Sequence, residues 1–181
     1  MTEAKSSSAA GDPRIAARLS NEIEGDVWFD AFSRGRYATD ASAYQIEPVG
    51  VVVPRTWQDV ISAIQIAADE EIAVLPRGAG TSQCGQTVGQ ALVIDTSAYL
   101  NSVIKVDPAR QRVCVEPGMV LDHLNRHLSS QGLMFPVDVS TSAQATIGGM
   151  AGNNSCGARS IRYGTMRDNV QAISGILADG Q

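Results

Sequence analysis

The chain has few cysteines and no long apolar run. Its 181 residues include three cysteines, Cys84, Cys114 and Cys156, with no C-x-x-C spacing, so the pattern favours neither a disulfide framework nor a cysteine-based metal or iron–sulfur site. A reducing setting is the simplest reading, and we expect a cytoplasmic protein. No segment approaches the roughly 18–20 apolar residues that span a bilayer, so we expect no integral membrane segment.

Positive charge is also scarce. The formal net charge is −5 and no Lys/Arg cluster occurs, so we expect no nucleic-acid partner, although a pocket for a nucleotide cofactor needs only local donors. The first dozen residues have neither a basic start nor an apolar core. They therefore predict a disordered lead-in rather than a signal peptide.

The chain shows no recognisable catalytic arrangement. His123 and His127 stand at i and i+4 of a predicted helix, which is metal-ligand spacing, but no third ligand and no H-E-x-x-H motif accompany them. We expect no metal and interpret both as partly exposed helix positions. No Ser/His/Asp arrangement or paired carboxylates are evident, so the catalytic residues are unknown.

The hydrophobic pattern indicates an α+β fold. A β-branched run at 49–53, a helix from Thr56 to about Glu70 and a strand at 72–75 predict a βαβ unit with parallel pairing. A further strand is expected at 91–94. Strands at 102–107 and 111–116, joined by an Asp-Pro turn, predict an antiparallel hairpin, and a helix through 121–128 should end near Gly132.

The chain ends are less regular in the sequence. Residues 12–31 show a weak helical pattern, residues 33–45 predict an irregular arm, and residues 170–181 predict a strand that enters a hairpin.

A glycine-rich stretch follows the predicted strand at 72–75. Residues 76–85 read Pro-Arg-Gly-Ala-Gly-Thr-Ser-Gln-Cys-Gly, and they match neither the G-x-G-x-x-G nor the P-loop spacing. Glycine lets successive main-chain N–H groups converge on an anion, while Thr81, Ser82 and Arg77 add donors and charge. Since ligands bind at the carboxyl ends of parallel strands, this turn is a candidate phosphate-binding loop.

A second stretch, residues 136–170, is dominated by small, polar and glycine residues. Such a segment buries little apolar area, so a loop system shaped around a polar ligand explains it better than a structural role. Gly148 and Gly149 predict the start of a short helix whose free N–H groups offer a second anion site. Both loops would then flank one large ligand, and the alternative is two unrelated flexible loops.

Together these motifs resemble the FAD-binding domain of the vanillyl-alcohol-oxidase/PCMH-type flavoproteins. The residues that carry the resemblance are Pro-Arg-Gly-Ala-Gly-Thr at 76–81, the turn from Pro136 to Thr141, Thr-Ile-Gly-Gly at 146–149 and the segment 154–164. The chain is most similar to the FAD-linked D-2-hydroxy-acid dehydrogenases. The resemblance implies a PCMH-type fold, incomplete at the C-terminus, with a small βαβ lobe and a second lobe of mainly antiparallel strands with helices.

The resemblance also implies domain limits and cofactor contacts. Residues 1–45 would form a tail and arm, and 46–181 the FAD-binding domain, with lobes at 46–100 and 101–181. In the first loop, the implied contacts are Pro76, Arg77, Gly78, Ala79, Gly80, Thr81, Ser82, Gly85 and Gln86. A second wall is implied at Pro136, Asp138, Thr141 and Ser142. The flavin and ribityl region would run along Thr146, Gly148, Gly149, Asn154, Ser155, Gly157, Arg159, Tyr163 and Gly164.

Two departures from the family bear on the cofactor. Members with covalent flavin commonly carry a histidine near the position of Thr81, so we expect noncovalent FAD. Cys84 and Cys156 stand where many relatives have smaller residues; we interpret them as small buried thiols, with cofactor contact as the alternative.

The resemblance implies a redox enzyme. FAD would accept a hydride equivalent from a small D-2-hydroxy acid, such as D-lactate, D-2-hydroxyglutarate or glycolate. An iron–sulfur domain, a quinone or an electron-transfer flavoprotein would then accept the electrons. The general base and carboxylate clamps of such enzymes normally lie beyond the matching region, so we expect an inactive piece of a longer protein, with self-association through exposed edges. The alternative is a UDP-N-acetylmuramate-dehydrogenase-like protein or a nucleotide-binding module without redox activity.

Overall fold

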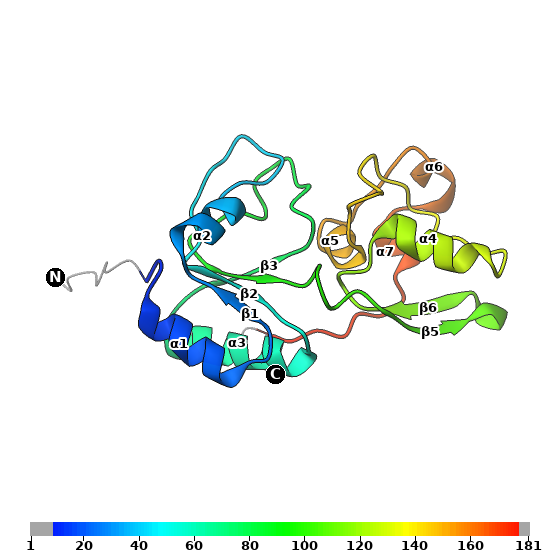
Figure 1. Cartoon of the computed structure of the whole chain (residues 1–181). Helices are drawn as coiled ribbons and strands as arrows, with labels where there is room; N and C mark the ends of the chain where they lie inside the picture. The colour runs from blue at the N-terminus through cyan, green and yellow to red at the C-terminus, as the bar shows by residue number, and fades with distance from the viewer. Residues whose placement is uncertain (1–8, 178–181) are drawn as a thin grey trace. The chain divides into compact units, whose positions relative to one another are not determined.

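The computed structural model describes residues 9–177, whose path is shown in Figure 1. These residues form two compact units. The first contains the described residues up to Pro76, Ser82–Ile94 and Leu177, and the second contains Arg77–Thr81 and Asp95–Ile176. The glycine-rich loop therefore passes from the second unit to the first between Thr81 and Ser82. Most of the predicted lead-in, and the end of the predicted C-terminal hairpin, lie outside the described residues.

The first unit is built on a four-stranded sheet in the order β1-β2-β4-β3. Its strands are β1 (Asp26–Trp28), β2 (Gly50–Val53), β3 (Val74–Arg77) and β4 (Leu92–Asp95). β1 is antiparallel to β2, and β2 is parallel to β4, with Val51 opposite Val93. The N–H of Leu92 donates to the carbonyl of Ala73, and the N–H of Thr96 donates to the carbonyl of Arg77. Since the acceptor moves forward along the chain by as many residues as the donor, β3 and β4 are parallel as well.

The predicted βαβ unit is correct in its elements and wrong in its pairing. β2 and β3 are not neighbours, because β4 lies between them. The reason is burial: every residue of β2 and β4 is buried, whereas β3 is only partly buried, so the two most apolar strands take the centre of the sheet. β3 also extends two residues further than predicted, and Pro76, which has no N–H, is tolerated on this edge strand.

Three helices complete the first unit. α3 (Trp57–Asp69) begins after Thr56 as predicted, and α1 (Pro13–Glu22) lies beside it (Figure 1). α2 (Ala31–Tyr37) occupies part of the segment 33–45, so the prediction of an irregular arm is wrong at its start. Asp30 caps α2 by accepting a hydrogen bond from the N–H of Ser33, which is a cap that the sequence analysis missed.

Asp59 is a buried carboxylate of the first unit that accepts several main-chain hydrogen bonds. The residue is only 3% exposed, and it forms a capping box with Thr56 at the start of α3. Its Oδ1 accepts from the N–H of Glu24 at 3.1 Å, and its Oδ2 accepts from the N–H of Arg55 at 2.8 Å. Burial raises the pKa of this carboxyl, but the hydrogen bonds from Arg55, Glu24 and Thr56 outweigh it, so the pKa lies below its ordinary value.

Charged side chains join α1 to the end of α3. Arg14 donates to both carboxylate oxygens of Glu70, at 2.8 and 2.6 Å, and Arg18 donates to Glu70 at 3.2 Å. These two guanidinium groups lower the pKa of Glu70 to about 2, with the hydrogen bond from Arg14 as the largest cause.

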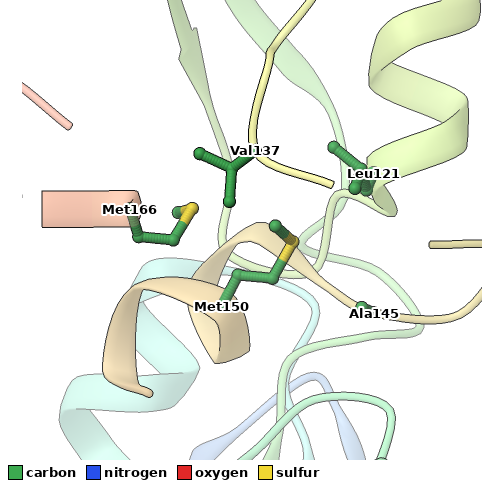
Figure 2. Packing of buried hydrophobic residues seen from close by; sticks show 5 residues of the cluster. All are labelled: Leu121, Val137, Ala145, Met150 and Met166. Carbon is green, nitrogen blue, oxygen red and sulfur yellow. The ribbon is translucent and has the colours of Figure 1, made fainter. Parts of the chain in front are cut away.

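The second unit combines a hairpin with four short or medium helices. The hairpin is β5 (Val103–Asp107), a 3-10 turn η1 (Pro108–Arg110) and β6 (Arg112–Val115), which confirms the predicted antiparallel pair. The helices are α4 (Leu121–Ser129), α5 (Ile147–Gly152), α6 (Ser160–Tyr163) and α7 (Met166–Asn169). Figure 2 shows one of its apolar clusters, formed by Leu121, Val137, Ala145, Met150 and Met166.

Two further sequence expectations concern extended or apolar segments. Residues 171–177 contain no strand, so the predicted strand is wrong over this range; within residues 9–177 their main chain has no hydrogen-bonded neighbouring strand, which a strand requires. Among the same described residues, no helix is both long enough and apolar enough to cross a bilayer.

Replacement of Asp59 by asparagine should destabilise the first unit. The amide presents one oxygen and one donor where the carboxylate accepts from three N–H groups, and a hydrogen bond to a charged group contributes about 1.5–3 kcal/mol. We expect Asp59→Asn to lower the free energy of unfolding by about 2 kcal/mol at pH 7, measured by urea denaturation. The pKa of Asp59 is depressed, so its contribution is present above about pH 4 and is lost as the pH falls further. Equal unfolding free energies at pH 7 would contradict this role.

The pairing of Glu70 should appear in acid stability. Because its folded-state pKa is about 2, its contribution is fully present above about pH 4.5 and is lost as the pH falls toward 2. We expect Glu70→Gln to lower the thermal midpoint at pH 7, and the difference from the parent chain should disappear near pH 2. Glu71→Gln is the matched control, because Glu71 is exposed and has no recorded ion pair within residues 9–177. A pH-independent difference for Glu70→Gln would count against the ion pairs.

Candidate functional site

The phosphate-loop candidate begins at Gly78, directly after β3 ends. Within the described residues, no recorded hydrogen bond uses the main-chain N–H groups of Gly78, Ala79, Gly80 or Thr81. Gly80 has a φ of +65°, in the left-handed region, and the guanidinium of Arg77 lies close enough that a Cβ on Gly80 would be 2.6 Å from its Nη2. Four unused N–H groups beside a cation are the donors that a main-chain cradle for an anion requires, and we call residues 78–81 the candidate cradle.

The loop rests against the residue that precedes α5. A Cβ on Gly78 would collide with Oγ1 of Thr146, a residue that is only 2% exposed. Thr146 is the N-cap of α5, and its Oγ1 accepts a hydrogen bond from the N–H of Gly149 at 3.3 Å. The structure therefore brings Gly78 to Thr146 within one unit, as the two-loop hypothesis requires.

The predicted second anion site at the start of α5 is wrong. The N–H of Ile147 donates to Met119 and that of Gly148 to Pro117, both at 2.8 Å, and the N–H of Gly149 is bound by Thr146. The cause is an isolated antiparallel bridge between Val120 and Thr146. This bridge aligns residues 117–119, whose carbonyls accept these hydrogen bonds, with the first turn of α5. These helix N–H groups are therefore already satisfied.

Asp138, Gly157 and Arg159 are brought together in the second unit. The N–H of Arg159 donates to Oδ1 of Asp138 at 2.9 Å, and Gly157 approaches the Asp138 main chain so closely that a Cβ would collide with its carbonyl oxygen. The carbonyl of Thr141 accepts from the N–H groups of Gln144 and Ala145, which forms the turn before Thr146.

A polar network fixes the segment from Asn154 to Asn169. Asn154 has a φ of +47°, and its Oδ1 accepts from the hydroxyl of Thr165 at 3.0 Å and the N–H of Arg167 at 2.9 Å. Oδ2 of Asp168 accepts from the N–H of Thr165 at 2.8 Å. This main-chain hydrogen bond is the largest cause that holds the pKa of Asp168 below its ordinary value. The amide of Asn169 donates to the carbonyls of Tyr163 and Thr165.

No role was predicted for Thr165 and Asp168 from the sequence. They form a capping box at the start of α7, and the T-x-x-D spacing is the signal that identifies such a box. Gly164, which was included, precedes this box with a φ of +80°, and its position beside Asp168 leaves no room for a Cβ.

The remaining loop residues, including Ser82, Gly85 and Gln86, lie in the first unit. Gly85 has a φ of +76° and lies against the ring of Tyr44. Asp40 accepts from the hydroxyl of Thr87 at 3.0 Å and from the N–H of Ser42 at 2.8 Å. Burial raises the pKa of Asp40, but these hydrogen bonds lower it further than burial raises it, so the pKa is depressed. The arm thus holds this end of the loop.

Two hollows open on the second unit. One, of about 270 Å³, is lined by Pro136, Phe135 and the side of β6, and the other, of about 530 Å³, is lined by Asn154, Met166 and neighbouring residues. Neither is lined by residues 77–81, so the candidate phosphate site is a main-chain cradle rather than either of these hollows.

The histidines and cysteines take no part in these contacts. His123 and His127 are exposed on α4, and among residues 9–177 no three His, Cys, Asp or Glu side chains lie together as metal ligands would. Cys84 and Cys156 are exposed, so their interpretation as small buried thiols is wrong. Each lies in a loop rather than on the core-facing side of a helix or strand, which explains the exposure. Their contact with the cofactor stays a prediction.

Known proteins share both the sequence and the fold of the chain. The model of the FAD binding domain family matches residues 48–181. A D-2-hydroxyglutarate dehydrogenase from Escherichia coli is 35% identical over 96% of the chain and 18% of its own length. A mitochondrial cytochrome-type D-lactate dehydrogenase from Saccharomyces cerevisiae is 32% identical over 83% of the chain and 26% of its own length. The chain thus spans only a minor part of the length of either relative.

The structural comparison agrees. The carbohydrate oxidase from Microdochium nivale superposes with a TM-score of 0.77 at 22% identity, over 92% of the chain and 36% of that protein. This likeness shows the fold and confirms the α+β, PCMH-type architecture that the sequence predicts. The match to the domain model over most of the chain, with the unused N–H groups at Gly78 to Thr81, leads to one conclusion: the chain belongs to the FAD binding domain family, and FAD is its cofactor.

Proposed function

We propose that the chain is the FAD-binding part of a longer flavin-dependent oxidoreductase that oxidises a small D-2-hydroxy acid and passes the electrons to a second acceptor. The observation that carries this proposal is the main-chain cradle from Gly78 to Thr81, with Arg77 beside it. The substrate class rests on the names of the two relatives, a D-2-hydroxyglutarate dehydrogenase and a D-lactate dehydrogenase. These relatives favour this function over the UDP-N-acetylmuramate-dehydrogenase-like alternative.

Different residues of the second unit are proposed to have different roles in the cofactor site. Gly78 to Thr81 bind the pyrophosphate through N–H groups, and Arg77 neutralises part of its charge. Asp138, Gly157 and Arg159 hold the neighbouring turn in place. When bound, FAD supplies the two-electron redox chemistry, while the chain orients it and excludes competing reactions. The full proposed cofactor site, with ligands and supporting residues together, comprises residues 76–82, 85–86, 136, 138, 141–142, 146, 148–149, 154–155, 157, 159 and 163–164.

The whole protein's surroundings are also part of the proposal. The electron acceptor is an iron–sulfur domain, a quinone or an electron-transfer flavoprotein, and the chain alone lacks an assigned general base. We propose the cytoplasm as its location because its three cysteines are free and exposed, as a reducing compartment permits.

The FAD-binding domain is proposed to start near residue 46, close to the beginning of the family match. Self-association of the chain is proposed through exposed strand edges.

The binding mode of FAD gives the first test of this function. Thr81 has no imidazole to form a covalent bond to the flavin ring, so the binding should be noncovalent. We expect purified chain, titrated with FAD, to perturb the flavin absorption bands and to gain thermal stability. After acid precipitation, the yellow colour should remain in the supernatant. Flavin that stays with the precipitate would contradict noncovalent binding, and an unchanged spectrum and thermal midpoint with excess FAD would contradict FAD binding.

The cradle itself is tested by a methyl group at Gly80. A φ of +65° costs an L-residue about 1–2 kcal/mol, and the added Cβ would also displace Arg77. We expect Gly80→Ala to raise the Kd for FAD about tenfold, measured by fluorescence quenching. Gly152→Ala is the matched control, because no atom lies within 4 Å of its Cβ position. Unchanged affinity in Gly80→Ala would exclude this loop as the pyrophosphate site.

The substrate class needs the longer protein in which this chain occurs. Dye-linked assays with D-lactate, D-2-hydroxyglutarate and glycolate should give turnover with at least one of the three, and none with L-lactate or L-2-hydroxyglutarate. Absence of turnover with every hydroxy acid, in protein that retains FAD, would remove the substrate proposal and leave FAD binding intact.

A further inference from the structure

We propose that Gly78 and Thr146 form an interlocked pair, in which Thr146 is a positioning residue for the phosphate-binding loop rather than a ligand of the cofactor. The effect on FAD rests on the proposed function of the loop, whereas the interlock itself is a property of the folded chain. Both residues belong to the second unit, so their contact is made within one compact body.

The contact leaves no space between the two residues. A Cβ on Gly78 would collide with Oγ1 of Thr146 and would lie 3.3 Å from its Cβ and 3.4 Å from its Cγ2. Glycine at 78 is therefore required by this neighbour and not by the backbone angle, since Gly78 is absent from the residues with positive φ. The loop meets Thr146 through the bare main chain of Gly78.

The Thr146 side chain has little freedom to move aside. Its Oγ1 already accepts the N–H of Gly149, and a threonine has few favourable side-chain rotamers. Rotation away from Gly78 would break this cap of α5. Because only 2% of the residue is exposed, Thr146 has little surface to offer a cofactor, and we assign its influence on the loop to its contact with Gly78.

The main chain around Thr146 is also fixed. The N–H of Leu121 donates to the carbonyl of Ala145 at 3.0 Å and that of Ile147 to Met119 at 2.8 Å, one on each side of Thr146. At the start of the loop, the N–H of Thr96 donates to the carbonyl of Arg77 at 3.1 Å. Gly78 thus lies between a hydrogen bond at Arg77 and the fixed side chain of Thr146.

Further contacts link the two residues that hold Gly78, so that the segments around the start of the loop form a closed ring. The carbonyl of Thr96 is approached so closely by Gly118 that a Cβ there would collide with it, and the N–H of Gly118 donates to Leu100 at 2.8 Å. Pro117, the preceding residue, accepts the N–H of Gly148. The start of the loop is therefore held from two directions, which sets where its unused N–H groups point.

Paired substitutions test the interlock. Gly78→Ala introduces the collision, and we expect it to raise the Kd for FAD about tenfold, because overpacking displaces the start of the loop. Thr146→Ala removes Oγ1 and should restore the affinity of Gly78→Ala to within about threefold of Thr146→Ala alone. Thr146→Ser keeps Oγ1 and the cap, so Gly78→Ala should bind FAD as weakly in the Thr146→Ser background as in the parent chain. The visible circular dichroism of bound FAD should follow the same pattern.

The thermal midpoints of the same variants without FAD separate the two parts of the proposal. If Gly78→Ala and Thr146→Ala show compensation in stability but the parent chain does not bind FAD, the interlock holds and the proposed function fails. If the losses in stability and affinity simply add in the double variant, or if Thr146→Ser rescues as well as Thr146→Ala, the interlock is overturned. Gly152→Ala again serves as the control: it should leave the affinity unchanged and should not lower the thermal midpoint, because it adds a methyl group without a collision in α5.

Discussion

The start of the candidate phosphate-binding loop depends on the approach of the bare main chain at Gly78 to the buried side chain of Thr146. No Cβ separates the loop from the start of α5, so the loop is held by a hydrogen bond at Arg77 and by a fixed side chain at Thr146. Protein interiors are close-packed, and a single added methyl group here has no empty volume to occupy. Ala79 and Gly80 therefore continue from a start that cannot shift, and this start sets the direction of their N–H groups.

This constraint also explains why the loop, and not the start of α5, is the candidate anion site. The same alignment that holds Thr146 in place uses the N–H groups of Ile147, Gly148 and Gly149 for internal hydrogen bonds. The N–H groups from Gly78 to Thr81 have no such partners within residues 9–177, and Arg77 lies beside them. Anion binding needs unused donors, so we propose the loop as the anion site and the helix as its support.

Local patterns in the sequence predicted the elements whose causes are local. The Thr56 cap and α3, the Asp-Pro turn of the hairpin, and α4 each follow from residues close together in the chain. Sequence patterns did not lead us to the capped helix α2, the capping box of Thr165 and Asp168, or the position of β4. The helix cap and the capping box correspond to local sequence patterns that can be recognised. Strand order, by contrast, depends on competition between strands for the buried centre of the sheet.

The sequence by itself determined the family, the FAD cofactor, the glycine-rich loop and the α+β composition, because these follow from residue types at fixed spacings. Only the tertiary structure decided which N–H groups are left unused, why residue 78 is glycine, and that Cys84 and Cys156 are exposed. The physical reason is that a hydrogen bond or a collision depends on which distant segment lies opposite a residue. The sequence specifies each donor and each missing Cβ, but the fold supplies the partner.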